Sequence, residues 1–171
     1  MGKIHIPEKV KLTVGLISGD AGLFIKIKKI LEKRFGRVDL ESDTLDFDNT
    51  SYYEKEMGEG LKRKFLSFGK PVSLKNIYKI KLYTNSLEKR FSESGKRSIN
   101  IDPGYLNLSR LVLFSTKDYS HRIYLNEGIF AEVTLFFKDK TFNPWPWAYP
   151  DYMSPEYIDI FNSIRKMYKA E

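Results

Sequence analysis

Residues 11–36 have the sequence KLTVGLISGDAGLFIKIKKILEKRFG, which predicts a strand followed by a helix. Residues 11–18 alternate and then become continuously apolar, as a largely buried strand does. Asp20 is a good N-cap for a helix over residues 21–35, where apolar side chains recur every three or four positions. Gly36 supplies the residue that commonly ends a helix. The stretch therefore predicts a strand–turn–helix unit with one buried helical face.

The sequence on its C-terminal side completes a repeating order of elements. Strands are predicted over residues 38–47, 61–68 and 98–101, and a second helix, capped by Ser73, places Ile77, Ile80, Thr84, Leu87 and Phe91 on one face. The order strand, helix, strand, strand, helix, strand is that of a ferredoxin-like split βαβ unit. We therefore predict an α+β fold in which two helices cover one face of a mostly antiparallel sheet.

The remaining third of the chain is rich in β-strand patterns. Strands are predicted over residues 110–116, 121–125 and 129–137, the last two forming a hairpin around Asn126-Glu127-Gly128. An aromatic and proline-rich strap, FNPWPWAYPDY, follows at residues 142–152, and Ser154-Pro155 begins a final helix. We predict a single domain over residues 1–171, with an N-terminal arm (1–10), the split βαβ unit (11–101) and a β-rich extension ending in a helix (102–171).

Composition excludes several classes of protein. The 171 residues are 42% hydrophobic and 15% aromatic, which is typical of a packed globular domain. No apolar run approaches the roughly 18 residues of a membrane span, and the start lacks the apolar core of a signal peptide, so we expect a cytoplasmic protein. With no Cys and two His, neither a metal site nor a cofactor is predicted. Abundant charge without Cys or Gln suggests a thermophilic source.

The net charge of +7 is unevenly distributed. Residues 39–60 carry eight acidic side chains and one basic side chain, whereas residues 61–97 carry eleven basic and two acidic ones. Such an arrangement can steer a nucleotide or a nucleic-acid backbone to the protein. Alternatively, the two segments neutralise each other at the surface.

Two apparent nucleotide-binding motifs are incomplete. GLISGDAG, residues 15–22, lies between a strand and a helix, but Leu23-Phe24 stand where a P-loop needs Lys and Ser or Thr. Thr116-Lys117-Asp118 lacks one residue of the T-K-x-D element that reads guanine in GTPases. The sequence therefore predicts no GTPase of that fold.

One polar cluster is predicted from the register of the hairpin. With a three-residue loop at 126–128, Tyr124 opposes Phe130 and Arg122 opposes Glu132 on the same face, while His121 points to the other face unless the strand bulges. Arg122 could grip a phosphate or carboxylate at two points, and Glu132 or His121 could transfer protons. The simpler alternative is an ordinary cross-strand Arg–Glu pair beside a solvated histidine. Further candidate ligand-binding residues near this cluster or in the basic segment are Ser115, Lys117, Asp118, Arg63 and Arg97.

Two other segments have competing interpretations. Asp102-Pro103-Gly104-Tyr105 fits a type II turn, which is either purely structural or places Asp102 and Tyr105 at the mouth of a site. The strap either seals a sheet edge or uses rings such as Trp147 to stack a base or to cover a pocket.

The same segments resemble a bacterial family known as domain of unknown function 4416. The resemblance is carried by VGLISGD (14–20), LKRKFLSF (61–68), GIFAEVTLFF (128–137), WAYPDY (147–152) and, most specifically, NIDPGYLNLSRLVLFSTKDYSHRIYL (100–125). It implies no established activity, although some members carry the label "GTP-binding protein". From the residues we predict binding of a nucleotide or another phosphorylated small anion, with or without acid–base chemistry. The alternatives are an RNA-binding module and a protein-interaction module.

Overall fold

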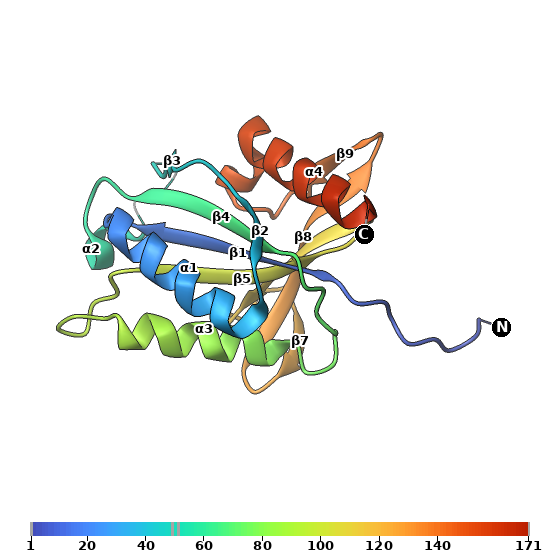
Figure 1. The fold of residues 1–171 in the computed structure, drawn as a ribbon, viewed down its shortest axis with the longest axis horizontal. Helices are drawn as coiled ribbons and strands as arrows, with labels where there is room; N and C mark the ends of the chain where they lie inside the picture. Colours follow the sequence, from blue (N-terminus) through green and yellow to red (C-terminus); the bar gives the residue numbers. More distant parts are fainter. Residues whose placement is uncertain (1, 49, 51, 171) are drawn as a thin grey trace.

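The structure is a computed structural model that describes residues 2–48, 50 and 52–170. Its described residues form one antiparallel sheet with the strand order β2-β4-β1-β5-β6-β8-β7, to which β3 and β9 are added by pairing with β4 and β8 (Figure 1). The strands are β1 (Lys11–Ser18), β2 (Val38–Glu41), β3 (Leu45–Asp46), β4 (Lys62–Phe68), β5 (Asn100–Leu106), β6 (Arg110–Ser115), β7 (Ile123–Asn126), β8 (Ile129–Lys138) and β9 (Thr141–Pro144). The helices are α1 (Ala21–Phe35), α2 (Glu54–Met57), α3 (Tyr78–Arg90), the 3-10 helix η1 (Pro150–Met153) and α4 (Pro155–Ala170). The predicted α+β fold with a mostly antiparallel sheet is confirmed.

The two faces of the sheet are covered by different helices. Alternate residues of β1, such as Val14 and Leu16, pack with α1 and α3, because successive side chains of a strand point to opposite faces. On the other face, Phe65 of β4 packs against Tyr157 and Phe161 of α4. Figure 1 shows α1 and α3 side by side and α4 across the sheet from them. β1 lies between β4 and β5 and is buried along its whole length, as its apolar sequence predicts.

Local signals place both ends of α1 and the start of α4. The Asp20 side chain accepts a hydrogen bond from the Gly22 N–H at 2.7 Å, and α1 ends before Gly36, as predicted. The Ser154 hydroxyl accepts from the Tyr157 N–H at 3.3 Å, and Pro155 is the first residue of α4. Ser73 does not cap α3, which begins five residues later at Tyr78.

Asp102-Pro103-Gly104-Tyr105 is not a turn, and this prediction is wrong. All four residues lie inside β5, which pairs with β1 along its whole length. Pro103 is compatible with that pairing because its missing N–H faces away from β1, toward β6. Tyr105 accordingly lies at no turn or site mouth and packs near Phe114.

Three further boundaries differ from the prediction. The strand predicted over residues 38–47 is two short strands, β2 and β3. β7 begins at Ile123 rather than at residue 121, because residues 119–122 form a turn closed by the Arg122 N–H and the Tyr119 carbonyl. Glu127 and Gly128 both have positive φ and form a two-residue turn, so Asn126 opposes Ile129 while Tyr124 still opposes Phe130. Among the described residues, no helix is long and apolar enough to cross a membrane.

Candidate functional site

The site begins at a fork in the sheet, where β5 and β6 separate. Their pairing runs from Leu106–Leu111 to Gly104–Leu113 and stops there. The next rung would need an N–H from Pro103, which proline lacks. At Gly104, a Cβ would lie 2.3 Å from the Val112 carbonyl oxygen, so only glycine allows this close approach of the strands. The Pro-Gly pair therefore joins the strands tightly and then lets them diverge.

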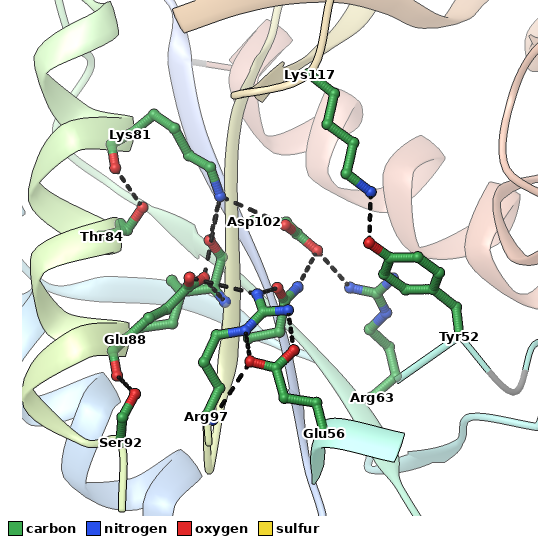
Figure 2. Close-up of polar contacts among 12 residues, drawn as sticks. Tyr52, Glu56, Arg63, Lys81, Thr84, Glu88, Ser92, Arg97, Asp102 and Lys117 are labelled. Atoms are coloured by element: carbon green, nitrogen blue, oxygen red, sulfur yellow. Dashed lines mark hydrogen bonds and ion pairs between the residues drawn. The ribbon is translucent and has the colours of Figure 1, made fainter. Parts of the chain in front are cut away.

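Side chains of helix α3 hydrogen-bond the backbone groups of β5 that have no partner on β6. The Ile101 N–H donates to Glu88 Oε1 at 2.6 Å, and Lys81 Nζ donates to the Ile101 carbonyl at 3.0 Å (Figure 2). Both side chains are buried on the helix face turned toward β5. Glu88 and Lys81 hydrogen-bond the N–H and C=O of Ile101, which would otherwise pair with β6. These contacts keep β5 and β6 apart.

A cavity of about 680 Å³ lies in the fork between β5 and β6. Its walls come from β4, α3, β5, β6 and β8, from the loop before α2, and from the segment that leads into η1. Rings surround it, including Phe47, Tyr53, Phe114, Tyr119 and Tyr149. This size is in the usual range of roughly 300–1,000 Å³ for small-molecule sites.

Asp102 stands at the centre of the charged residues in this cavity. Its carboxylate accepts from the Asn100 amide at 2.6 Å and lies 3.6 Å from Lys81 and 3.5 Å from Arg63. Arg63 also pairs with Asp151 of η1 at 2.8 Å. The guanidinium of Arg63 crosses β1 at Gly15, where a Cβ would lie only 2.8 Å from it. Gly15 thus makes room for this ion pair rather than for a phosphate.

Arg97 closes one end of the cavity. It forms a two-point pair with Glu56 of α2, with 2.7 Å from Nε to Oε1 and 2.6 Å from Nη2 to Oε2 (Figure 2). Its other terminal nitrogen donates to Asn100 and lies 3.6 Å from Glu88. Such fork-to-fork pairing fixes the planar group in one orientation.

The predicted cluster on β8 surrounds Glu132, whose side chain is 1% exposed. Glu132 Oε2 accepts from Arg122 Nε at 2.6 Å and contacts His121 Nε2 at 3.2 Å. Arg122 also donates to the Ser115 hydroxyl at 2.8 Å and to the Tyr149 hydroxyl at 2.8 Å. His121 reaches the same face as Glu132 because it lies in the turn before β7, not in the strand, and this corrects the predicted orientation.

Lys117 differs from the other basic side chains of the cavity. Among the residues that the structure describes, it has no carboxylate within ion-pair distance, whereas Arg63, Lys81, Arg97 and Arg122 each have at least one. Its Nζ donates to the Tyr52 hydroxyl at 2.8 Å across the cavity rim (Figure 2). The Ser115 and Thr116 side chains belong to the same stretch of lining.

Burial changes the acidity of several of these groups. It raises the pKa of Glu88, although Lys81 and the Ile101 N–H oppose the change. It also raises the pKa of the Tyr53 hydroxyl, which stays neutral. Burial alone would lower the pKa of Arg122, but the hydrogen bond and charge of Glu132 raise it overall. Among the described residues, no group of three His, Asp or Glu side chains could hold a metal ion.

Of the eleven residues named from sequence, seven line the cavity. These are Arg63, Arg97, Asp102, Ser115, Lys117, Arg122 and Glu132. His121 touches it only through Glu132, Asp118 is exposed on the loop after β6, and Tyr105 packs elsewhere. Trp147 lines a separate groove, stacked between Trp145 and His121, and donates to the Val133 carbonyl.

Sequence reasoning missed several residues that build the site. The most important are Lys81 and Glu88, together with Glu56, Tyr52, Tyr53 and Asp151. A signal for the α3 residues was present, because positions 81, 84, 85 and 88 form a polar stripe at helical spacing beside the apolar one. Nothing comparable marks Glu56 or Asp151, whose partners lie 41 and 88 residues away.

Over residues 8–168, the sequence matches the family described as Domain of unknown function (DUF4416). The chain belongs to this family. No curated protein and no solved structure matches it. The resemblance seen in the sequence is confirmed, but a family of this description assigns no activity to the fork. Only the geometry of the cavity therefore indicates what the protein binds.

Proposed function

We propose that this protein binds a nucleotide or another phosphorylated small molecule in the fork cavity, with its phosphate at Lys117. The observation that carries the proposal is Lys117, a rim cation without a carboxylate partner among the described residues, at the edge of a cavity of about 680 Å³. A phosphate there would accept hydrogen bonds from the ammonium and from the hydroxyls of Ser115 and Thr116. Among the described residues, the Tyr52 hydroxyl is the one hydrogen-bond partner of the ammonium that the phosphate would displace.

The rest of the cavity supports a small ligand of low charge. Its lining holds five basic and four acidic side chains, and four of the basic ones are already paired. These pairs fix the walls before any ligand arrives, which lowers the ordering cost of binding. A ligand with one phosphate and hydroxyl or amide groups suits this balance better than a long polyanion.

The pairing of the charged segments weighs against the RNA-binding alternative. Lys62 pairs with Asp46, Lys64 with Glu41 and Arg97 with Glu56, so three of the eleven basic side chains of residues 61–97 are neutralised by acids of residues 39–60. Arg63 and Lys81 of the same run are buried. The protein-interaction alternative is weakened by the contacts of Trp147 and Trp145 with the sheet and with each other.

One observation favours chemistry in addition to binding. Glu132 lines the cavity, His121 Nε2 lies 3.2 Å from its carboxylate, and such a pair can relay a proton. We assign Glu132 and His121 as the acid–base candidates on this contact. Hydrolysis of a bound phosphate ester by the wild-type chain, absent in Glu132→Gln, tests that assignment.

We also propose a more specific fold assignment, a cellular location and a source for the protein. The order β2-β4-β1-β5, with α1 and α3 on one face, supports a ferredoxin-like split βαβ unit, and β6 to α4 support the predicted extension with its hairpin and strap. The cytoplasmic location and the thermophilic source stay proposals that rest on composition.

The test is calorimetric titration of the full chain with inorganic phosphate, ribose 5-phosphate and nucleoside monophosphates. We expect saturable binding of a phosphorylated probe, weakened about tenfold in Lys117→Ala, since a charge-assisted hydrogen bond contributes about 1.5–3 kcal/mol. Lys62→Ala is the matched control, because Lys62 is exposed, paired with Asp46 and outside the cavity. Binding that is unchanged in Lys117→Ala, or absent for every phosphorylated probe, would overturn the proposal.

A further inference from the structure

The fork leaves hydrogen-bonding groups of β6 without a strand partner. Continuing the register of Gly104–Leu113 would place Pro103 opposite Phe114 and Ile101 opposite Thr116. Pro103 cannot donate to the Phe114 carbonyl. Ile101 cannot pair with Thr116, because Glu88 and Lys81 already hold both of its backbone groups. The edge of β6 therefore ends in an acceptor, the Phe114 carbonyl, followed by a donor, the Thr116 N–H.

Both residues line the cavity. The direction they face follows from the hairpin itself. The Asn107 N–H donates to the Arg110 carbonyl at 3.0 Å, which makes residues 107 and 110 a hydrogen-bonded pair. Hydrogen-bonded pairs recur at every second residue, so residues 112 and 114 turn their backbone groups toward β5, and continuing this alternation one residue past the end of β6 at Ser115 points the Thr116 N–H the same way. In the fork, that direction is the cavity.

We infer that the main chain of β6 at Phe114 and Thr116 reads the hydrogen-bonding edge of a nucleobase. A base offers an adjacent donor and acceptor on a planar edge, the complement of what the strand presents. The rings of Tyr119 and Tyr149, both exposed at the cavity, supply surfaces on which a base can stack. Thr116 is followed directly by Lys117, so the base and phosphate sites adjoin. The inference rests on the proposed function and names its ligand class, a nucleoside monophosphate.

An inserted peptide strand would fit the fork less well. A strand between β5 and β6 would need backbone partners on both sides, but the Ile101 groups on β5 are occupied by α3. A base needs hydrogen-bond partners only on the β6 side of the fork. The side chains of Asn100 and Asp102 on the opposite wall then face the sugar, whose hydroxyls can donate to the Asp102 carboxylate.

Matched ligands test the inference without changing the protein. Adenosine 5′-monophosphate is compared with its N6,N6-dimethyl derivative, guanosine 5′-monophosphate with its N1-methyl derivative, and all four with ribose 5-phosphate, by titration calorimetry. We expect at least one parent nucleotide to bind about tenfold more tightly than both its methylated form and ribose 5-phosphate, as the loss of a buried hydrogen bond requires. Equal affinities for all five would overturn the base-reading inference while leaving phosphate binding intact. Binding of none would instead overturn the proposed function.

A variant pair tests the same point from the protein side. Thr116→Pro removes the backbone N–H, and Ser115 before it ends an extended strand, a conformation that proline tolerates in its predecessor. Thr116→Ala keeps the N–H but, like Thr116→Pro, loses the hydroxyl that would contact the phosphate, so it is the control for that loss. We expect Thr116→Pro to lose the preference for the parent nucleotide over ribose 5-phosphate, and Thr116→Ala to keep it. An undiminished preference in a folded Thr116→Pro protein contradicts the inference, and the methylated ligands decide the matter if that variant does not fold.

Discussion

Helices α1 and α3 cover the same face of the sheet but meet it in different ways. The buried residues of α1 are all apolar, namely Phe24, Ile27 and Leu31, whereas those of α3 include Lys81, Thr84 and Glu88. Each helix also uses one glutamate to bind a backbone N–H of a later strand. Glu32 of α1 accepts from Val38 at 3.1 Å, and Glu88 of α3 accepts from Ile101 at 2.6 Å.

The difference follows from the strands beneath the two helices. β1 is paired on both sides, so α1 has only apolar side chains to cover. β5 loses β6 at Pro103, so α3 must satisfy an open strand edge with charged groups. A buried polar stripe on a helix therefore marks a place where the neighbouring sheet is interrupted, and here that interruption is the cavity.

The largest expected effect is at the point where the fork closes. Gly104→Ala should destabilise the protein by about 4 kcal/mol or more. Its Cβ would lie 2.3 Å from the Val112 carbonyl oxygen, which cannot shift without moving β6. Gly22→Ala in α1 is the control and should change stability by no more than about 1 kcal/mol, because its Cβ meets only the Asp20 side chain. Urea unfolding of both variants measures the difference. Similar losses in the two would mean that β5 and β6 are not tightly joined at Gly104.

A smaller effect separates the two glutamates. Glu88→Ala should cost about 3 kcal/mol, because it leaves the Ile101 N–H and Lys81 buried with fewer partners. Glu32→Ala should cost about 1 kcal/mol, since its hydrogen bond is only partly buried. The free energies of unfolding of both variants in the same buffer provide the test. If Glu32→Ala proved as costly as Glu88→Ala, the open edge of β5 would not need its charged partner.

The smallest effect is a pH dependence. The pKa of Glu88 is raised above its ordinary value of 4.5 by burial, so the folded protein holds this proton more tightly than the unfolded chain. Its contribution to stability is therefore greatest below pH 4.5 and is lost as the pH rises through the raised pKa. Glu88→Gln, which does not titrate, should gain stability relative to wild type over that range, by less than Glu88→Ala loses. Urea midpoints from pH 4 to 8 measure this, and a constant or opposite difference would contradict it.

Much of the fold was predictable because its signals are local. The Asp20 cap, the end of α1 at Gly36 and the Ser154-Pro155 start of α4 all depend on residues within a few positions of one another. The pairing of Tyr124 with Phe130 was predicted from a three-residue loop; the turn has two residues, and a register shift between Tyr124 and Asn126 restores the pairing. Asp102-Pro103-Gly104-Tyr105 failed for the opposite reason, since local turn chemistry was overridden by pairing with β1, some 90 residues earlier.

The apolar faces of the helices and strands, the membership in the family and the residue types near β6 and β8 were all predictable from the order of residues. Which charges meet depends on how the elements pack together. Arg63 with Asp151, Arg97 with Glu56, and Glu88 with Ile101 join segments 13 to 88 residues apart. Side-chain periodicity reports which face of an element is buried, but it does not report which other element covers that face. The position of the fork, and of the cavity within it, depends on that second choice.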